Sequence, residues 1–187
     1  MKFPSQYNCL TRNMFEIGNY KIIPIRYEDR IAIMHWRNEQ IFHLRQDKPL
    51  TELSQESYFK GTVAKLFEPK KPNQILFSYL QNGKCIGYGG LVHINWIDKN
   101  AEISFVLNTE VEKKQFEYHW LNYLKLIEQL AFEELQFHKV FVYAFDLRPH
   151  LYQAIEKGGF TKEAVLKEHC FYDNIFIDVV IHSKIRK

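Results

Sequence analysis

The chain has 187 residues, of which 46% are hydrophobic and 16% aromatic, and its formal net charge is +3. This length suits one domain that can bury a complete core without disulfide or metal staples. With 8 glycines, 6 prolines and no basic stripe, the composition excludes collagen-like and disordered chains and argues against a nucleic-acid binder.

The first third of the chain predicts an irregular extension followed by one strand and two helices. Residues 1–19 are polar, and we expect an N-terminal extension that packs loosely or at an oligomer contact, ahead of a single domain over 20–187. YKIIPIRY at 20–27 is typical of a strand, and a helix is expected over 28–38. A second helix is predicted to begin near Ser54 and to end at the two prolines of EPKKPN.

The middle of the chain predicts a hairpin, a strand and the longest helix. ILFSYL at 75–80 and KCIGYGGLVHINW at 84–96 flank an Asn-Gly pair at 82–83, which is a strong turn signal. NAEISFVL at 100–107 is the next strand. Apolar residues at spacings of three and four then predict a helix over 116–135.

The last third reads as strand, helix and a long hairpin. HKVFVYAF at 138–145 alternates as a strand in a packed sheet does. Pro149 suits the start of a helix, and the glycines at 158–159 suit its end. An Asp-Asn turn at 173–174 then joins two further strands. Helices inserted between runs of strands predict a mixed sheet with helices on both faces.

Two motifs carry a resemblance to a known family. EKGGF, followed by the late hairpin FYDNIFIDVVIHSKI, and the upstream segment MHWRNEQIFHLRQ resemble the GNAT acyltransferase superfamily, in particular its ribosomal-protein and aminosugar N-acetyltransferase branch. The resemblance runs from Lys21 to Ile185. It implies an α/β fold of the α+β type, with a mixed, mostly antiparallel central sheet. It also implies acetyl-CoA as cosubstrate, a primary amine as acceptor and no metal.

The resemblance assigns catalytic roles to two residues. Glu102 lies in an apolar strand, where a carboxylate is costly unless it faces a cleft, and relatives carry a carboxylate there near the acceptor amine. Glu102 is therefore the candidate base; the alternative is a strand charge that faces water. Many relatives have a tyrosine acid where this chain has Ile155. Tyr152, on roughly the same helix face, is the substitute candidate, and a packing aromatic is the alternative.

Cofactor binding is predicted at three places. The resemblance implies that the backbone of Phe105, Val106 and Leu107 holds pantetheine where neighbouring strands splay. The glycine-rich phosphate loop of the family is absent, because NTEVEKKQFEYHW at 108–120 contains no glycine. We therefore expect charge from Lys113, Lys114 and Arg148 to replace backbone contacts to the phosphates.

Acceptor binding is predicted at two clusters. Trp36, Arg37 and Asn38 form the first, and His93 and Trp96 the second, although core packing and a helix end explain the same residues. The favoured acceptor is a nucleotide-linked aminosugar, and a protein N-terminal amine is the alternative. The missing glycines and the displaced tyrosine also leave open a non-catalytic CoA-binding module.

Cysteine usage and hydropathy point to an ordinary cytoplasmic protein. Cys85 and Cys170 fall in strand-like runs and behave as small core residues, and no two cysteines have metal-ligand spacing. No apolar run approaches the roughly 18 residues of a membrane span. We expect no metal, no nucleic-acid partner, no membrane association, and a monomer or homodimer.

Overall fold

The computed structural model describes residues 3–187, which contain an eight-stranded sheet in the order β1-β2-β3-β4-β5-β6-β8-β7. The strands are β1 (Phe15–Ile17), β2 (Tyr20–Pro24), β3 (Ile75–Gln81), β4 (Lys84–Asn95), β5 (Asn100–Leu107), β6 (Lys139–Phe145), β7 (Thr161–Tyr172) and β8 (Ile175–Ile185). The helices are α1 (Arg30–Glu39), α2 (Glu52–Gly61), α3 (Thr109–Glu128) and α4 (Pro149–Lys157). Short helical turns are η1 (Tyr27–Asp29), η2 (Ile41–His43), η3 (Val63–Leu66) and the π-helical η4 (Gln129–Glu134).

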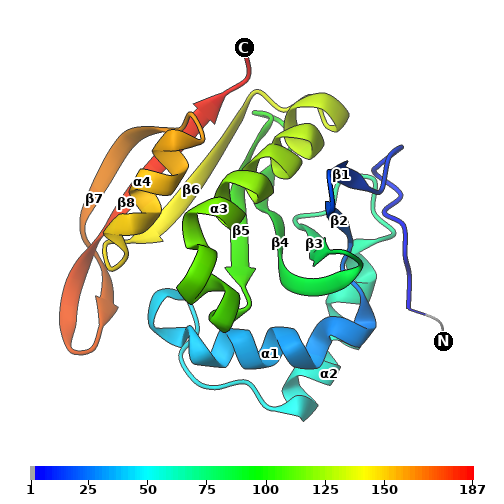
Figure 1. Ribbon diagram of the computed structural model, residues 1–187, viewed down its shortest axis with the longest axis horizontal. Helices are drawn as coiled ribbons and strands as arrows, with labels where there is room; N and C mark the ends of the chain where they lie inside the picture. Colours follow the sequence, from blue (N-terminus) through cyan, green and yellow to red (C-terminus); the bar gives the residue numbers. More distant parts are fainter. Residues whose placement is uncertain (1–2) are drawn as a thin grey trace.

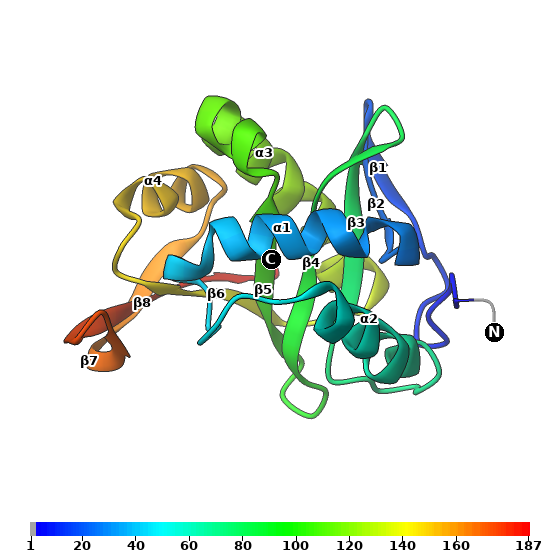
Figure 2. The same ribbon diagram turned by 90° about the horizontal axis from the view of Figure 1, so that it is seen from below.

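The sheet is mixed and mostly antiparallel, with helices on both faces, as the sequence predicts. Every neighbouring pair is antiparallel except β5 and β6. Seen from below, α3 and α4 lie above the sheet and α2 lies beneath it, while α1 crosses in front of the strand ends (Figure 2). The central strands therefore bury side chains on both faces, and β3 is buried at six of its seven positions.

The parallel pair β5–β6 opens partway along its length. It is paired only from Asn100–Lys139 to Glu102–Phe141, whereas β6 stays paired with β8 as far as Phe145. Beyond Glu102 the two strands diverge, as the ribbon shows (Figure 1). A splay in the middle of a sheet leaves strand edges without a ladder partner, and a ligand can use those backbone groups.

Both predicted tight turns are confirmed. Asn82 and Gly83 join β3 to β4 with φ of 50° and 81°. Asp173 and Asn174 join β7 to β8 with φ of 48° and 61°. Two consecutive positive φ values are typical of the hairpin turn whose twist matches the flanking strands.

The N-terminal segment packs more tightly than the sequence suggests. Within 3–19, the ring of Tyr7 stacks on Phe67 at 4.0 Å, and its hydroxyl both donates to the carbonyl of Leu76 and accepts from the amide of Leu76, each at 2.9 Å. Each such bond contributes about 0.5–1.5 kcal/mol. The segment ends in β1, which pairs with β2. The expectation of loose packing was wrong; Met1 and Lys2 lie outside the described residues.

The longest helix begins earlier than predicted. Asn108 caps α3, because its side-chain oxygen accepts from the amides of Glu110 and Val111 at 3.0 and 3.1 Å. The helix therefore starts at Thr109 and not at the expected Phe116; a break at Gln115, with φ of −141°, lies close to the expected start. Within residues 3–187 no helix is long and apolar enough to cross a membrane.

Candidate active site

A cavity of about 490 Å³ occupies the splay between β5 and β6. Ile103 and Phe105 of β5 line one wall, and the β6 residues from Val142 to Phe145 line the opposite wall. The remaining lining comes from α1, α2, α3, β3, β4, Ile25, Gln74 and the segments around residues 43–50 and 148–151. The cavity therefore exists because two adjacent strands separate.

Glu102 lies where the strands part and lines this cavity. Its carboxylate is buried, and both of its oxygens are engaged. Oε1 accepts from Nη2 of Arg45 at 2.5 Å, and Oε2 accepts from Nδ1 of His93 at 2.7 Å. The predicted base is thus held by two donors inside the cavity and does not face open water.

Arg45 spans the mouth of the splay. Besides its bond to Glu102 on β5, its guanidinium lies over the ring of Tyr143 on β6, 4.7 Å from the centroid. Burial and a hydrogen bond with Cys170 raise the pKa of Tyr143 to about 12, so this ring stays neutral. Arg45 belongs to the irregular segment between η2 and α2, and about half of its side chain is exposed.

Asn38 shapes the segment that carries Arg45. Its amide nitrogen donates to the carbonyl of Leu50 at 2.8 Å, and its oxygen accepts from the amide of Leu50 at 2.7 Å. The same oxygen accepts from the side chain of Gln46 at 3.1 Å. Asn38 does not line the cavity, so its contribution is to hold the segment 44–50 across the cavity.

Arg37 presents a second positive charge to the cavity. Its Nη1 donates to the hydroxyl of Tyr88 at 2.6 Å and its Nε to Gln46 at 3.0 Å. Within residues 3–187 no carboxylate lies within ion-pair distance of Arg37. A partly buried guanidinium with only neutral partners is well placed to bind an anionic ligand.

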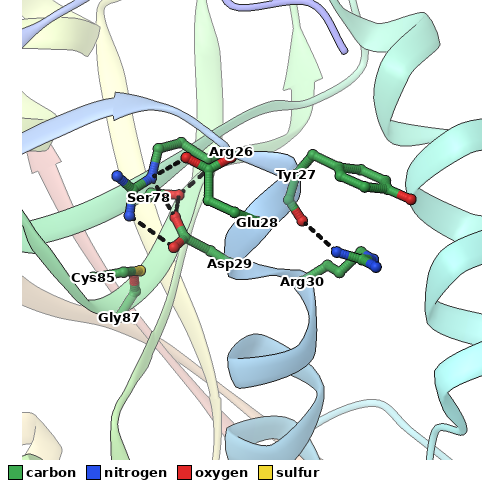
Figure 3. A network of polar contacts seen from close by, with 8 residues as sticks. All are labelled: Arg26, Tyr27, Glu28, Asp29, Arg30, Ser78, Cys85 and Gly87. Atoms are coloured by element: carbon green, nitrogen blue, oxygen red, sulfur yellow. Dashed lines mark hydrogen bonds and ion pairs between the residues drawn. The ribbon is translucent and has the colours of Figure 1, made fainter. Parts of the chain in front are cut away.

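The start of α1 is fixed by a polar network on the sheet (Figure 3). Asp29 is buried and accepts two bonds from Arg26, from Nε and Nη2 at 2.7 Å each, and a third from the hydroxyl of Ser78 on β3, also at 2.7 Å. Removing one partner of such a buried pair costs about 3–5 kcal/mol. This network fixes α1, and with it Arg37, relative to the strands.

A buried cluster around Arg148 contributes Arg148 and His43 to the cavity lining. Arg148, just before α4, donates from Nη1 to the ring of His43 at 2.8 Å and from Nη2 to Glu112 of α3 at 3.2 Å. Its guanidinium also lies 5.2 Å from the ring centroid of Phe116, and its buried Nε has no partner among the described residues. Burial lowers the pKa of Arg148 and raises that of Glu112, although the guanidinium opposes the latter shift.

His43 connects this cluster to the end of β5. Its Nε2 bonds to Oε1 of Gln40 at 3.2 Å, and Nε2 of Gln40 donates to the carbonyl of Leu107 at 2.7 Å. Burial, with the nearby positive charge of Arg148, lowers the pKa of His43 to about 3. The ring is therefore neutral, and it can accept the bond that Arg148 donates.

The residues predicted for pantetheine binding differ in their position relative to the splay. The carbonyl of Lys99 accepts from the amides of His138 and Lys139, so odd-numbered residues of β5 direct their backbone polar groups toward the β6 side. Of the odd-numbered residues, Ile103 and the predicted Phe105 line the cavity, whereas the predicted Val106 and Leu107 do not line it. The carbonyl of Leu107 is moreover occupied by Gln40.

Three predicted aromatic site residues lie away from the cavity. Trp36 is buried in the core, and Trp96 packs edge-on against Phe137 while its indole nitrogen donates to the carbonyl of Pro72. Tyr152 donates to Asp146 at 2.9 Å and stacks on His182. Burial and the bond with Asp146 raise the pKa of Tyr152. The structure supports a packing role for all three.

The two predicted lysines are on the surface of α3. Lys113 and Lys114 are exposed, and Lys113 pairs with Glu110 one turn earlier at 2.7 Å. They lie inside the first turns of the helix and not on a loop ahead of it, because Asn108 sets the start. Neither lysine lines the cavity, which leaves Arg148 as the predicted phosphate ligand that does.

Sequence reasoning missed Arg45, His43, Tyr88, Glu112 and Tyr143. These five residues come from five different segments, and each contributes through a partner that is distant in the chain. Arg45 and His43 lie within the motif MHWRNEQIFHLRQ. The motif therefore marks the correct segment, although the residues predicted from it lie at 36–38. The other three carry no signal that the sequence alone makes visible.

Comparison with known proteins gives one family and one fold. Residues 22–181 match the family described as the acetyltransferase (GNAT) domain. A spermidine N-acetyltransferase from Vibrio cholerae, in complex with CoA and spermine, superposes with a TM-score of 0.75 at 18% identity, over 89% of this chain and 95% of that chain. A dodecameric structure of the spermidine N-acetyltransferase from Vibrio cholerae gives a TM-score of 0.70 at 20% identity, over 89% of this chain and 94% of that chain.

A further structure described as a putative acetyltransferase gives a TM-score of 0.70 at 17% identity, over 93% of this chain and 87% of that chain. The TM-scores establish a shared fold, and at these low identities they leave open what the chain acts on. Among residues 3–187 no group of histidine, cysteine or acidic side chains is arranged to hold a metal ion.

Proposed function

The chain belongs to the GNAT acetyltransferase family and is an N-acetyltransferase that uses acetyl-CoA, and from this premise we propose that Glu102 is its general base and that its acceptor is a primary amine on an anionic molecule. The favoured acceptor within this class is a nucleotide-linked aminosugar. The charge of the cavity lining carries the proposal.

The environment of Glu102 supports its role as base. Its carboxylate lies at the point where β5 and β6 separate and lines the cavity. An ionised carboxylate can only accept hydrogen bonds and protons, and His93 fixes one of its oxygens. Glu102 can therefore take a proton from an amine that reaches the splay, a contribution that is typically worth 10²–10⁴-fold in rate.

The acyl donor fits the splay. When bound, acetyl-CoA supplies the acetyl group as an activated thioester. Ile103 and Phe105 offer the unpaired strand edge on which the pantetheine amides can bond, as an added strand would. The unpartnered, buried Nε of Arg148 is a donor that lacks an acceptor at the start of α4, where it can bind a phosphate oxygen.

The lining favours an anionic acceptor over a polyamine. Arg37 and Arg45 line the cavity in addition to Arg148, which is assigned to the cofactor, while Glu102 is the one carboxylate among the described lining residues. A polycation such as the spermine of the Vibrio cholerae complex would meet this excess of positive charge. An acceptor that carries phosphate would instead neutralise it.

A thiol-release assay with acetyl-CoA tests the proposal. The panel contains a nucleotide-linked aminosugar, an aminosugar phosphate, the unphosphorylated aminosugar, spermine and a peptide with a free N-terminus. We expect the highest kcat/KM for the first two amines. Spermine or the peptide as the best substrate would overturn the acceptor class, and CoA binding without turnover of any amine would favour a non-catalytic module.

A further inference from the structure

We propose that Arg45 occupies the position of the acceptor's ammonium group and that the acceptor displaces it. On this view the amine binds between Oε1 of Glu102 and the ring face of Tyr143, and the released guanidinium binds the acceptor's negative group. Arg45 is then the residue that selects an amine bearing an anion. The inference rests on the proposed function for its acceptor class.

The contacts of Arg45 are those that a substrate ammonium would make. Nη2 lies 2.5 Å from Oε1 of Glu102, and the guanidinium carbon lies 4.7 Å from the centroid of Tyr143. A carboxylate oxygen and an aromatic face are the two partners that an alkylammonium seeks in a partly dry site. They come from β5 and β6, on the two sides of the splay.

Arg45 competes with an amine for Glu102. His93 engages Oε2 and Arg45 engages Oε1, so both oxygens of the buried carboxylate already have a donor. A carboxylate oxygen can accept more than one hydrogen bond, so the amine needs the space that Arg45 fills between Oε1 and the ring of Tyr143, and not a free lone pair. Arg45 belongs to an irregular segment and covers that ring, so it is the donor that an amine bound between β5 and β6 replaces.

Exposure makes the exchange feasible. The side chain of Arg45 is 47% exposed, against 8% for Arg148. Water can therefore solvate the released guanidinium. The buried carboxylate of Glu102 keeps His93 as a donor and gains the incoming ammonium in exchange for Arg45.

The guanidinium of Arg45, once released, can bind the acceptor's negative group together with Arg37. Arg37 lines the same cavity without a carboxylate partner among the described residues, so a negative group drawn by Arg45 would meet a second guanidinium there. Two guanidinium groups can hold a phosphate through several charge-assisted hydrogen bonds. The amine on Glu102 and the anion on the arginines would then orient the acceptor.

The experiment compares two amines that differ by one phosphate, glucosamine 6-phosphate and glucosamine, in the parent and in Arg45→Ala. We expect the substitution to raise the KM for glucosamine 6-phosphate on the order of 10-fold or more, which is the scale of a lost charge-assisted bond. For glucosamine KM should stay or fall, because the resident cation no longer competes. Arg45→Lys keeps a positive charge, so its KM for glucosamine 6-phosphate should lie between those of the parent and Arg45→Ala.

Arg12→Ala is the matched control. Arg12 is also 47% exposed, pairs with Glu133 at 3.2 Å and lies over the ring of Phe15 at 4.4 Å, but it does not line the cavity. It should change neither KM. Equal shifts of both KM values in Arg45→Ala, or a fall in kcat alone for both amines, would overturn the exchange.

Calorimetry separates this inference from the proposed activity. Both amines are titrated into the CoA-saturated protein, in which no acetyl group can transfer. A loss of affinity in Arg45→Ala that is confined to the phosphorylated amine supports the exchange even if turnover fails. Affinities that Arg45→Ala leaves unchanged overturn the exchange while leaving the acetyltransferase assay to decide the proposed function.

Discussion

Two arginine–glutamate pairs contribute their arginines to the lining of the same cavity. In the first pair Arg45 and Glu102 have side chains that are 47% and 7% exposed; in the second pair Arg148 and Glu112 are 8% and 17% exposed. The first arginine lies on an irregular segment, and the second immediately precedes α4 and contacts α3. The chemistry of the partners is the same, but the surroundings differ.

This difference separates an exchangeable charge from a structural one. Arg45 can leave Glu102 into water, so a ligand that offers a cation can take its place. Arg148 is buried, and losing it would leave the partly buried carboxylate of Glu112 without this partner. We therefore expect one pair to govern acceptor choice and the other to hold the helices that frame the cofactor side.

The largest expected effect is on stability, from Arg148→Met. Breaking the buried pair from one side should cost about 3 kcal/mol or more, which for a chain of this size lowers Tm by roughly 6–12 °C. Differential scanning calorimetry measures this shift. Arg148→Met combined with Glu112→Gln should recover much of it, because no charge is then left unpaired.

The corresponding change at the first pair, Arg45→Met, should lower stability by less than Arg148→Met does. Glu102 keeps His93 as a donor and faces a cavity that water can enter. Equal losses in the two single variants would remove the distinction between the pairs.

Glu102→Gln should lower turnover on the order of 10²-fold or more while keeping the fold and the affinity for acetyl-CoA. The amide has the shape of the carboxylate but cannot take up the amine's proton. The loss should be greatest at low pH, where most of the acceptor is protonated. Thiol release across a pH range measures the effect, and an unchanged rate below the acceptor's own pKa would exclude Glu102 as base.

His43, which bonds the buried Arg148, should also make stability depend on pH. Its folded pKa of about 3 lies below its usual value near 6.5, so the unfolded chain takes up a proton that the folded chain refuses. Stability is therefore complete above pH 6.5 and is lost as pH falls toward 3, by at most about 1.4 kcal/mol per pH unit. Urea unfolding at pH 7.5 and 5.5 should show a loss of about 1 kcal/mol from this residue.

His43→Gln should lose that part of the pH dependence. His35→Gln is the matched control, because His35 is an exposed histidine on the neighbouring α1 and should keep the parent's profile. A parent whose stability does not change between the two pH values would show that His43 is protonated in the folded state.

Lys113→Ala combined with Lys114→Ala should weaken acetyl-CoA binding only a few-fold and should flatten its dependence on salt. Both side chains are exposed, and exposed charges are screened over about 8–10 Å at physiological ionic strength. Titrations at low and high salt measure both effects. Alanine substitution of the exposed Lys70 and Lys71 is the matched control. An effect of equal size in that variant would show that Lys113 and Lys114 do not contact the phosphates specifically.

The smallest expected effect is that of Tyr152→Phe. The hydroxyl bonds Asp146 and the ring stacks on His182, outside the cavity lining. Removing it should leave the acetyl-transfer rate within about twofold, because the hydroxyl is outside the cavity lining. The lost hydrogen bond should lower stability by roughly 0.5–1.5 kcal/mol. A marked slowing of thiol release with unchanged acetyl-CoA affinity would return Tyr152 to the role of acid.

Local chemistry made much of this fold predictable. The Asn-Gly and Asp-Asn turns, the alternating strands and Pro149 ahead of α4 follow from backbone preferences that act over a few residues. The same applies to Glu102, because a carboxylate within an apolar strand is unusual enough to stand out. Asn108 is a capping residue whose signal was present and overlooked, and it moved the start of α3 by seven residues from the predicted Phe116 to Thr109.

By itself the sequence determined the order of the elements, the family and the candidate base. Only the tertiary structure decided which side chains meet that base. Arg45 is 57 positions from Glu102, and His43 is 105 positions from Arg148. Such contacts depend on where β5 and β6 part and on how the segment between η2 and α2 folds across that gap. No local preference encodes either, because both follow from how the whole sheet and its helices pack.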